Sequence, residues 1–404
     1  MSYPGGKLSA MTDELLARHD RLLTATPPFS LTASLRALAG FAPCAGDQLV
    51  ADGRVRKAFP RPGSPDEAVV VEVAPSEDAV CGVLLSVNAR SSLGASEIDD
   101  IERTVRDWLS LDDDMSGFLA VARGDPATAR VLEVVEGLHQ VRFASLAEGA
   151  TYFTLSQRST QWFAAARKRR IAAELGPRAV LDGVSYVAFP ALGALRALDA
   201  APPGRDVAGQ ALVGFAGNRQ RADRLRQVLD GVAALDEKWL RTAPYADARG
   251  ALLAIPGVGT FTAHAILLRV LGRPDDVPLE MAQFSRVAGA LYGEPAPAPD
   301  ELRERYGAWI GWWAYLTRMG LGWLDQPEKD SSQRSRERTP HPVAPLARTP
   351  SAESDQAGAD MSRWAHRSLA SPVNSRRKRA AISEPPPTSV ALTRSATSLP
   401  NAST

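Results

Sequence analysis

The first 111 residues carry short apolar runs that are typical of strands, together with one longer amphipathic segment. Three runs separated by turn-forming Gly and Pro predict strands, residues 47–59, 68–74 and 80–87, and the last two are rich in Val and Leu. Residues 29–41 predict a short strand followed by an amphipathic helix, and residues 96–111 predict a helix with Ser96 as its N-cap. Residues 1–26 are polar and partly helical at best. The pattern indicates a small α/β module with an antiparallel sheet.

From Asp112 onward, apolar residues recur at helical spacing, and we expect an all-α region that ends near residue 326. Its first helical segments are residues 115–123, 126–136 and 145–175. The rest of the chain lacks this periodicity and is rich in Pro, Ser, Thr, Ala and Arg, which predicts a disordered tail. The expected fold class is α+β. We expect four parts: a polar N-terminal tail (residues 1–26), the α/β module (27–111), the helical core (112–326) and a basic C-terminal tail (327–404).

One stretch of the helical region, residues 252–280, has a turn sequence with chemical consequences. An apolar helical end runs into Pro-Gly-Val-Gly at residues 256–259, and a second helix starts near Thr260. Two glycines before a helix let the backbone turn tightly and leave the first N–H groups of that helix without partners. Such a terminus can bind a phosphate oxygen. An ordinary pair of helices joined by glycines has the same local pattern.

Composition limits the classes of partner and cofactor. The chain has 404 residues and a net charge of +1, but Lys, Arg, Asp and Glu give −7 over residues 1–142, +3 over 143–326 and +5 over 327–404. A nucleic-acid partner is therefore permitted but not shown by bulk charge. With Cys44 and Cys81 as the two cysteines, a Cys-rich zinc site and a four-Cys iron–sulfur cluster are excluded. The sequence has no run of membrane-spanning length and no secretory signal, so we expect no membrane partner and a cytoplasmic protein.

The segment around the turn resembles the helix-hairpin-helix of the DNA glycosylase superfamily, and in particular the DNA-3-methyladenine glycosylase II family. In that family, Leu/Ile-Pro-Gly-Val/Ile-Gly is followed by Thr-Ala and, further along, by a Pro and an acidic residue. This chain has all of these, at residues 255–259, at Thr262 and Ala263, and at Pro278 and Glu280. The resemblance implies a monomeric, bacterial base-excision repair enzyme that releases alkylated purines from double-stranded DNA without a cofactor.

The resemblance also implies how the chain binds DNA. The hairpin would hold the phosphate beside a flipped nucleotide, with a monovalent cation on its carbonyl groups as an option, through Pro256, Gly257, Val258, Gly259 and Thr262. Gln157 and Arg158 occupy the loop that inserts a wedge into the gap, with Arg158 as the inserted residue or as a contact to phosphate or solvent. Phe261 and Trp312 would line the base pocket, where π faces attract a cationic base by roughly 0.5–2 kcal/mol.

Glu280 occupies the position of the family's catalytic Asp. A carboxylate beneath the deoxyribose stabilises the positive charge that builds up as the N-glycosidic bond breaks. The extra methylene of Glu displaces this charge, and a shift of about 1 Å can cost on the order of 100-fold in rate. The alternatives are an acidic residue at a helix N-terminus and, for the whole protein, a weakened or inactive paralogue that binds damaged DNA. Bifunctional relatives have Lys where this chain has Phe261, so we expect no lyase activity.

Overall fold

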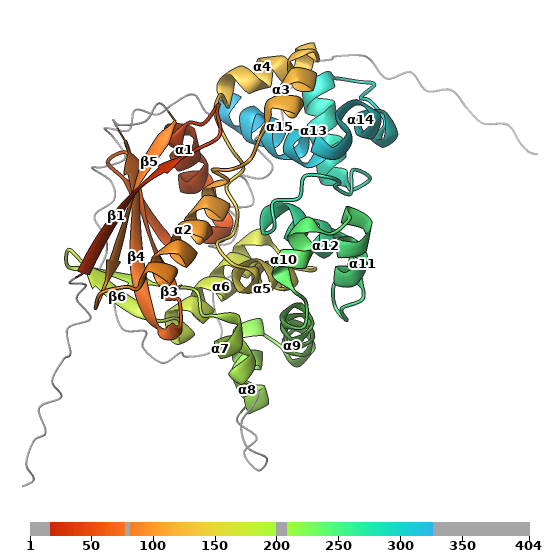
Figure 1. Cartoon of the computed structure of the whole chain (residues 1–404). Coiled ribbons are helices and arrows are strands. Elements are labelled where there is room, and N and C mark those ends of the chain that lie inside the picture. Colours follow the sequence, from red (N-terminus) through yellow and green to blue (C-terminus); the bar gives the residue numbers. More distant parts are fainter. Residues whose placement is uncertain (1–16, 77–80, 199–207, 326–404) are drawn as a thin grey trace, which may run out of the picture. The chain divides into compact units, whose positions relative to one another are not determined.

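The computed structural model describes residues 17–76, 81–198 and 208–325, and the first of these ranges forms most of a five-stranded antiparallel sheet. The strands lie side by side in the order β1 (Ala17–Thr24), β5 (Gly82–Ala89), β4 (Ser64–Pro75), β3 (Arg54–Arg61) and β2 (Gln48–Ala51) (Figure 1). Helices follow the sheet along the chain, which confirms the predicted α+β class. Within the described ranges, every helix is too short or too polar to cross a membrane. The predicted tail over residues 327–404 lies outside these ranges.

The prediction that residues 1–26 form a tail is wrong for β1, which pairs with β5 along its whole length. β1 is an edge strand, and Leu23 is its one buried side chain, so it lacks the alternation that identifies a strand in a sequence. The short strand expected at the start of residues 29–41 is absent. The Ser30 hydroxyl accepts a hydrogen bond from the Ala33 N–H, so the helix α1 (Leu31–Gly40) begins there.

The first long helix, α2 (Ala95–Leu109), starts before the predicted N-cap at Ser96. Gly94 takes the N-cap position, and its N–H donates to the Glu97 carboxylate at 2.8 Å. The carboxylate therefore does what the Ser96 hydroxyl was expected to do, because it satisfies a backbone donor at the start of the helix. Further along, the helix buries Ile98, Ile101 and Val105 against the sheet.

The two faces of the sheet are covered by different elements. Val69, Val71 and Val73 of β4 point toward α1 and α2 and belong to the main hydrophobic cluster. Val70, between them, points to the opposite face, since successive side chains of a strand alternate. That face is covered by a second, two-stranded sheet of β6 (Arg178–Leu181) and β7 (Val184–Val187) (Figure 1).

This second sheet corrects the expectation of an all-α region after residue 112. Its strands are joined by Asp182 and Gly183, which have φ angles of +53° and +74°. Asp-Gly between hydrophobic residues is a strong signal for a two-residue hairpin turn, and the sequence has it between Leu181 and Val184. The hairpin was missed because each strand has only four residues.

The described part of residues 112–325 is otherwise helical. Its helices are α3 (Ser116–Arg123), α4 (Pro126–Val134), α5 (Leu146–Ser156), α6 (Gln161–Leu175), α7 (Leu192–Ala197), α8 (Ala208–Ala216), α9 (Arg219–Ala233), α10 (Glu237–Thr242), α11 (Tyr245–Leu253), α12 (Thr260–Arg269), α13 (Ala282–Tyr292), α14 (Pro299–Tyr306) and α15 (Ile310–Leu324). Residues 145–175, predicted as one segment, form two helices. The break lies at residues 157–160, where the Thr160 hydroxyl caps α6 by accepting from the Phe163 N–H.

A buried charge cluster, made of Cys44, Asp47, Lys57, Glu148 and Lys168, joins the sheet module to α5 and α6. The Lys168 ammonium is fully buried and forms ion pairs with Glu148, at 2.7 Å, and with Asp47. Lys57 approaches Glu148 at 3.6 Å, and the Cys44 thiol donates to the same carboxylate at 3.4 Å. Cys44, Asp47 and Glu148 lie close enough together to be metal ligands. We interpret the cluster as structural, because two lysines already supply the positive charge that a metal would bring.

Candidate functional site

The Pro-Gly-Val-Gly turn forms a tight hairpin, residues 254–259, between α11 and α12. Ile255 and Val258 are buried and anchor it in the hydrophobic core. Gly257 adopts a φ of +91°, a conformation that residues with a side chain rarely adopt. Gly259 is the N-cap of α12 and offers no side chain to the first turn of that helix. The first turn of α12 therefore has no side-chain cap, and binding of a phosphate oxygen by its N–H groups stays a prediction.

Replacing Gly257 by Ala is expected to distort the hairpin. The new Cβ would lie 2.7 Å from Cγ of Arg224, and the left-handed backbone would be strained at a cost of about 1–3 kcal/mol. Thermal unfolding should show the loss of stability, and duplex DNA should bind more weakly. Gly250→Ala in α11 is the matched control, because its Cβ would meet no atom within 4 Å. Equal behaviour of the two variants would contradict a special role for the Gly257 backbone.

The wedge loop, residues 157–160, is fastened to the hairpin by one side chain. The Gln157 amide donates to the Gly257 carbonyl at 2.9 Å and to the Thr262 hydroxyl at 3.0 Å. Gln157 therefore acts as a clamp in this structure. The next residue, Arg158, is exposed and has a φ of +51°, which turns its side chain out of the line of α5. Of the predicted wedge pair, Arg158 is the residue whose side chain is left to project.

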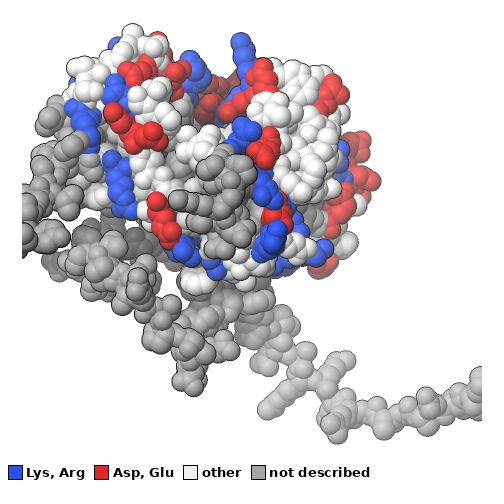
Figure 2. Space-filling model, turned by 90° about the horizontal axis from the view of Figure 1, so that it is seen from below, with Lys and Arg blue, Asp and Glu red and all other residues white. Residues whose placement is uncertain are grey.

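Two arginines of α9 extend this surface. Arg221 donates to the Ser159 hydroxyl at 2.9 Å, and the side chain of Arg224 packs beside Gly257. The hairpin, the wedge loop and the start of α9 thus form one continuous surface, which we call the site surface. Figure 2 views the molecule from the side on which α8 and α9 lie in Figure 1, and it shows basic groups with acidic groups between them. Attraction of an anion there would depend on a few placed arginines.

Glu280 lies just before α13, directly after the buried Leu279. Its side chain is 62% exposed, and Oε1 accepts an ion-paired hydrogen bond from Nη1 of Arg303 in α14 at 2.7 Å. This bond, together with a hydrogen bond from the backbone of Glu280 itself, holds the pKa of the Glu280 carboxyl below its ordinary value. The carboxylate is therefore ionised at neutral pH. Sequence reasoning missed Arg303, because nothing in the local pattern of α14 indicates a partner on another element.

A second carboxylate, Asp276, lies on the other side of Arg303. Its Oδ1 accepts from Nε of Arg303 at 3.3 Å, and its backbone carbonyl accepts from the Tyr245 hydroxyl at 3.1 Å. The Tyr245 hydroxyl also lies 2.8 Å from Nδ1 of His264, which is buried. Desolvation lowers the pKa of His264, so the ring is neutral and braces the backbone below the site.

The two rings predicted to line a base pocket lie in different hydrophobic clusters. Phe261, in the first turn of α12, packs edge-on against Phe153 with a centroid distance of 6.2 Å. Trp312 is 6% exposed and packs edge-on against Phe118, also at 6.2 Å. Among the described residues, Nε1 of Trp312 has no hydrogen-bond partner. A base pocket bounded by both rings stays a prediction.

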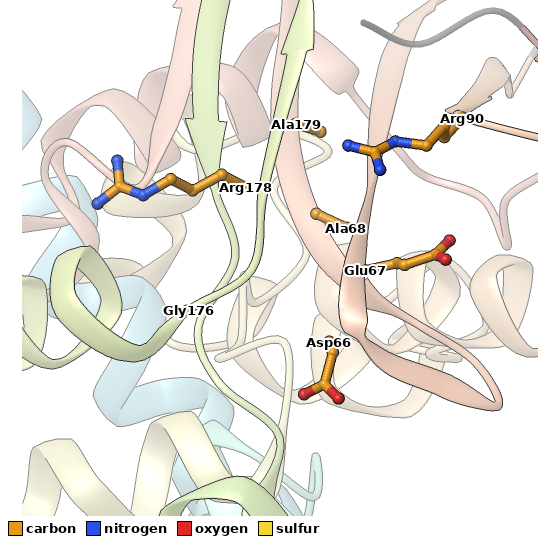
Figure 3. Close-up of a pocket in the computed structure, with 7 residues that line it drawn as sticks. All are labelled: Asp66, Glu67, Ala68, Arg90, Gly176, Arg178 and Ala179. Atoms are coloured by element: carbon orange, nitrogen blue, oxygen red, sulfur yellow. The ribbon is translucent and has the colours of Figure 1, made fainter. Parts of the chain in front are cut away.

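A hollow of about 310 Å³ lies elsewhere, between the sheet and the β6–β7 hairpin (Figure 3). Asp66, Glu67, Arg90 and Arg178 are the charged residues in its lining. Arg178 points away from the other three and donates to the Ala173 carbonyl (Figure 3). None of the predicted site residues lines this hollow, so it is separate from the site surface.

Comparison with known proteins gives the fold and its sequence relatives. No protein-family model matches the chain. The chain is 25% identical over 226 residues to a DNA-3-methyladenine glycosylase of Bacillus subtilis, in a match that covers 54% of this chain and 70% of that protein. It is 29% identical over 288 residues to the probable bifunctional transcriptional activator/DNA repair enzyme AlkA of Mycobacterium tuberculosis. That match covers 70% of this chain but 52% of the mycobacterial protein, so the chain spans about half its length.

Two solved structures share the fold. A 3-methyladenine DNA glycosylase from Archaeoglobus fulgidus superposes with a TM-score of 0.58 at 18% identity, over 74% of this chain and 98% of that one. The 8-oxoguanine glycosylase/lyase of Clostridium acetobutylicum, in complex with double-stranded DNA, superposes with a TM-score of 0.53 at 17% identity, over 76% and 98%. The chain is therefore a distant homologue of the DNA-3-methyladenine glycosylases, and it shares its fold with the structures of helix-hairpin-helix DNA glycosylases.

Proposed function

We propose that the protein is a monofunctional DNA N-glycosylase that releases alkylated purines from double-stranded DNA. The observation that carries the proposal is Glu280, an ionised carboxylate placed after the hairpin helix at the start of α13. The similarity of the protein to a DNA-3-methyladenine glycosylase supports the choice of an alkylated purine as the substrate class. The enzyme would act on the chromosome in the cytoplasm, as a monomer.

DNA would be held by the site surface. The free N–H groups at the start of α12 would bind a backbone phosphate, and Arg221 and Arg224 would add positive charge beside them. Arg158 would fill the gap that the flipped nucleotide leaves in the stack. The Gln157 amide ties the wedge loop to the hairpin. The bound phosphate and the inserted wedge would therefore keep a fixed position relative to each other.

The chemistry would be hydrolytic. Glu280 would stabilise the positive charge that develops on the deoxyribose and orient a water molecule for attack. Phe261 stands where bifunctional relatives carry an amine, so no Schiff base with the sugar would form there. The ring of Phe261 would favour a cationic, alkylated base over a neutral one.

A monovalent cation on the hairpin carbonyls is compatible with the backbone. The Gly257 oxygen accepts from Gln157, and the Ile255 oxygen accepts from the Val258 N–H. A carbonyl oxygen has two lone pairs, so each can take a further ligand. Such an ion would add positive charge beside the bound phosphate.

A second candidate function is recognition of damaged DNA without cleavage. It is favoured by the ion pair between Glu280 and Arg303, because a cation 2.7 Å from the carboxylate offsets part of its field. Single-turnover release of 3-methyladenine and 7-methylguanine from methylated duplex DNA distinguishes the two. Release of free purines supports the glycosylase. Tight binding of the damaged duplex without release would support the binding protein.

Arg303→Gln tests how the carboxylate is held in its ionised form. The pKa of Glu280 is lowered by Arg303, so base release should persist above that pKa and decline as the pH falls through it. Without Arg303 the pKa rises toward its ordinary value of about 4.3, and the acid limb of the pH–rate profile should move to higher pH. Arg103→Gln, which breaks an exposed pair with Asp100, is the control. An unchanged acid limb in Arg303→Gln would contradict the assigned coupling.

A further inference from the structure

Trp162, the second residue of α6, is the most exposed large apolar side chain in the described parts of the chain. The residue is 61% exposed, and within those parts its ring makes no aromatic contact and its indole N–H no hydrogen bond. The buried face of α6 is made instead by Ala164, Ala165, Lys168, Ile171 and Ala172. An indole left in water exposes a large apolar area, so its position needs an explanation beyond packing of the helix.

The ring next to it shows the contrast. Phe163 is covered by two cations, with the guanidinium of Arg167 at 5.0 Å and that of Arg221 at 4.7 Å from its centroid. Arg221 is also the residue that donates to Ser159 of the wedge loop. Phe163, in the first turn of α6, is therefore covered by arginines of the protein itself, whereas the ring of Trp162 beside it stays exposed to solvent.

Trp162 is joined to the site surface through a short, fixed path. Gln157 is hydrogen-bonded to the hairpin, Ser159 is hydrogen-bonded to Arg221 of α9, and Thr160 caps α6, the helix whose second residue is Trp162. Residues 157–160, between the hairpin contact and Trp162, are thus fixed by three sets of hydrogen bonds. The arginines around it, Arg158 and Arg221, complement the phosphates of a nucleic acid.

We propose that Trp162 stacks on the base left without a partner in the strand opposite the lesion, when the damaged nucleotide is flipped out. The inference rests on the proposed function and adds a contact to the second strand. In an intact duplex both faces of each base are stacked on its neighbours, so a ring has nothing to stack on. Flipping removes the partner of the opposite base, and a kink of the duplex at that step would unstack one of its faces. An exposed indole beside the wedge fits such a face, and base–aromatic stacking does not depend on which base is present.

Duplex DNA with a tetrahydrofuran abasic-site analogue tests the contact without any bond cleavage. Trp162→Ala should bind this duplex about 10-fold or more weakly than the wild type, and should bind an undamaged duplex equally well. Trp162→Phe keeps a ring and should retain most of the affinity. Trp239→Ala, which removes another exposed indole on α10, is the matched control and should change neither affinity.

A fluorescent 2-aminopurine placed opposite the analogue reports the stacking itself. Its emission should be quenched by the wild type and by Trp162→Phe, but less by Trp162→Ala. Equal affinity of Trp162→Ala and wild type for the abasic duplex, or an equal loss on both duplexes, would overturn the inference. If wild type still releases methylated purines in that case, the proposed function survives. A wild type that neither releases purines nor prefers the abasic duplex would overturn both.

Discussion

Glu280→Gln is expected to reduce the single-turnover rate of purine release by on the order of 100-fold or more, with little loss of DNA binding. Gln keeps the size of the side chain and removes the negative charge, so it should affect the transition state more than the ground state. The Arg303 ion pair is exposed, and such pairs contribute little to stability. The fold should therefore be unchanged, which thermal unfolding can check.

The control for this experiment is Glu237→Gln. Glu237 also pairs with an arginine, Arg241, at 2.7 Å, but on α10, away from the predicted site residues. It should leave the rate of release unchanged. Glu280→Asp adds a second comparison, because it introduces the side chain that the resemblance in sequence implies for a catalytic residue at this position. Release by Glu280→Gln at the wild-type rate would contradict the catalytic role. If wild type releases no purine and Glu280→Asp does, the natural protein binds damaged DNA and has lost catalysis through the replacement of Asp by Glu.

Lys168→Met is expected to lower the free energy of unfolding by about 3–5 kcal/mol, because it leaves two carboxylates without their main partner in a buried site. Lys168 is fully buried, as is Glu148, and it also pairs with Asp47. Burial alone would raise the pKa of Glu148, but the charges of Lys168 and Lys57 outweigh it and lower that pKa to about 2. Urea or thermal unfolding at neutral pH measures the effect.

The pH dependence of stability follows from the same pair. The folded pKa of Glu148 is depressed, so its contribution is present above the unfolded value of about 4.3 and is lost as the pH falls toward the folded one. Lys168→Met should remove most of this acid transition. Lys168→Met combined with Glu148→Gln should recover part of the stability, since fewer buried charges then lack a partner. Lys238→Met, at an exposed position on α10, is the control, and an equal loss in it would contradict the argument.

The hairpin and the Val-rich strands were predictable because their signals are contiguous in the chain. The conformation of Gly257 is a local backbone property, and the residues on either side anchor it in the core. The apolar run of β4 reflects burial on both faces of the sheet, with Val70 on one side and Val71 on the other. In both cases a short window of sequence contains the whole pattern.

β1 and the β6–β7 hairpin escaped prediction because their place depends on the sheet that they complete. β1 buries Leu23 and leaves most of its polar side chains at an edge. β6 and β7 bury Ala179 and Tyr186 against Ala58 and Val70, which lie more than a hundred residues earlier in the chain. Too few of their own residues are buried for a periodic signal.

The sequence by itself determined the α+β class and the hairpin before α12 and, through resemblance, it named Glu280 as the candidate carboxylate and Arg158 as the candidate wedge residue. Only the tertiary structure decided how they are held. It brings the Gln157 amide to the hairpin, sets Arg303 against Glu280, and leaves Trp162 uncovered. The physical reason is that these contacts join side chains on separate elements. Their partners are chosen by how the helices pack, which a pattern along one helix does not encode.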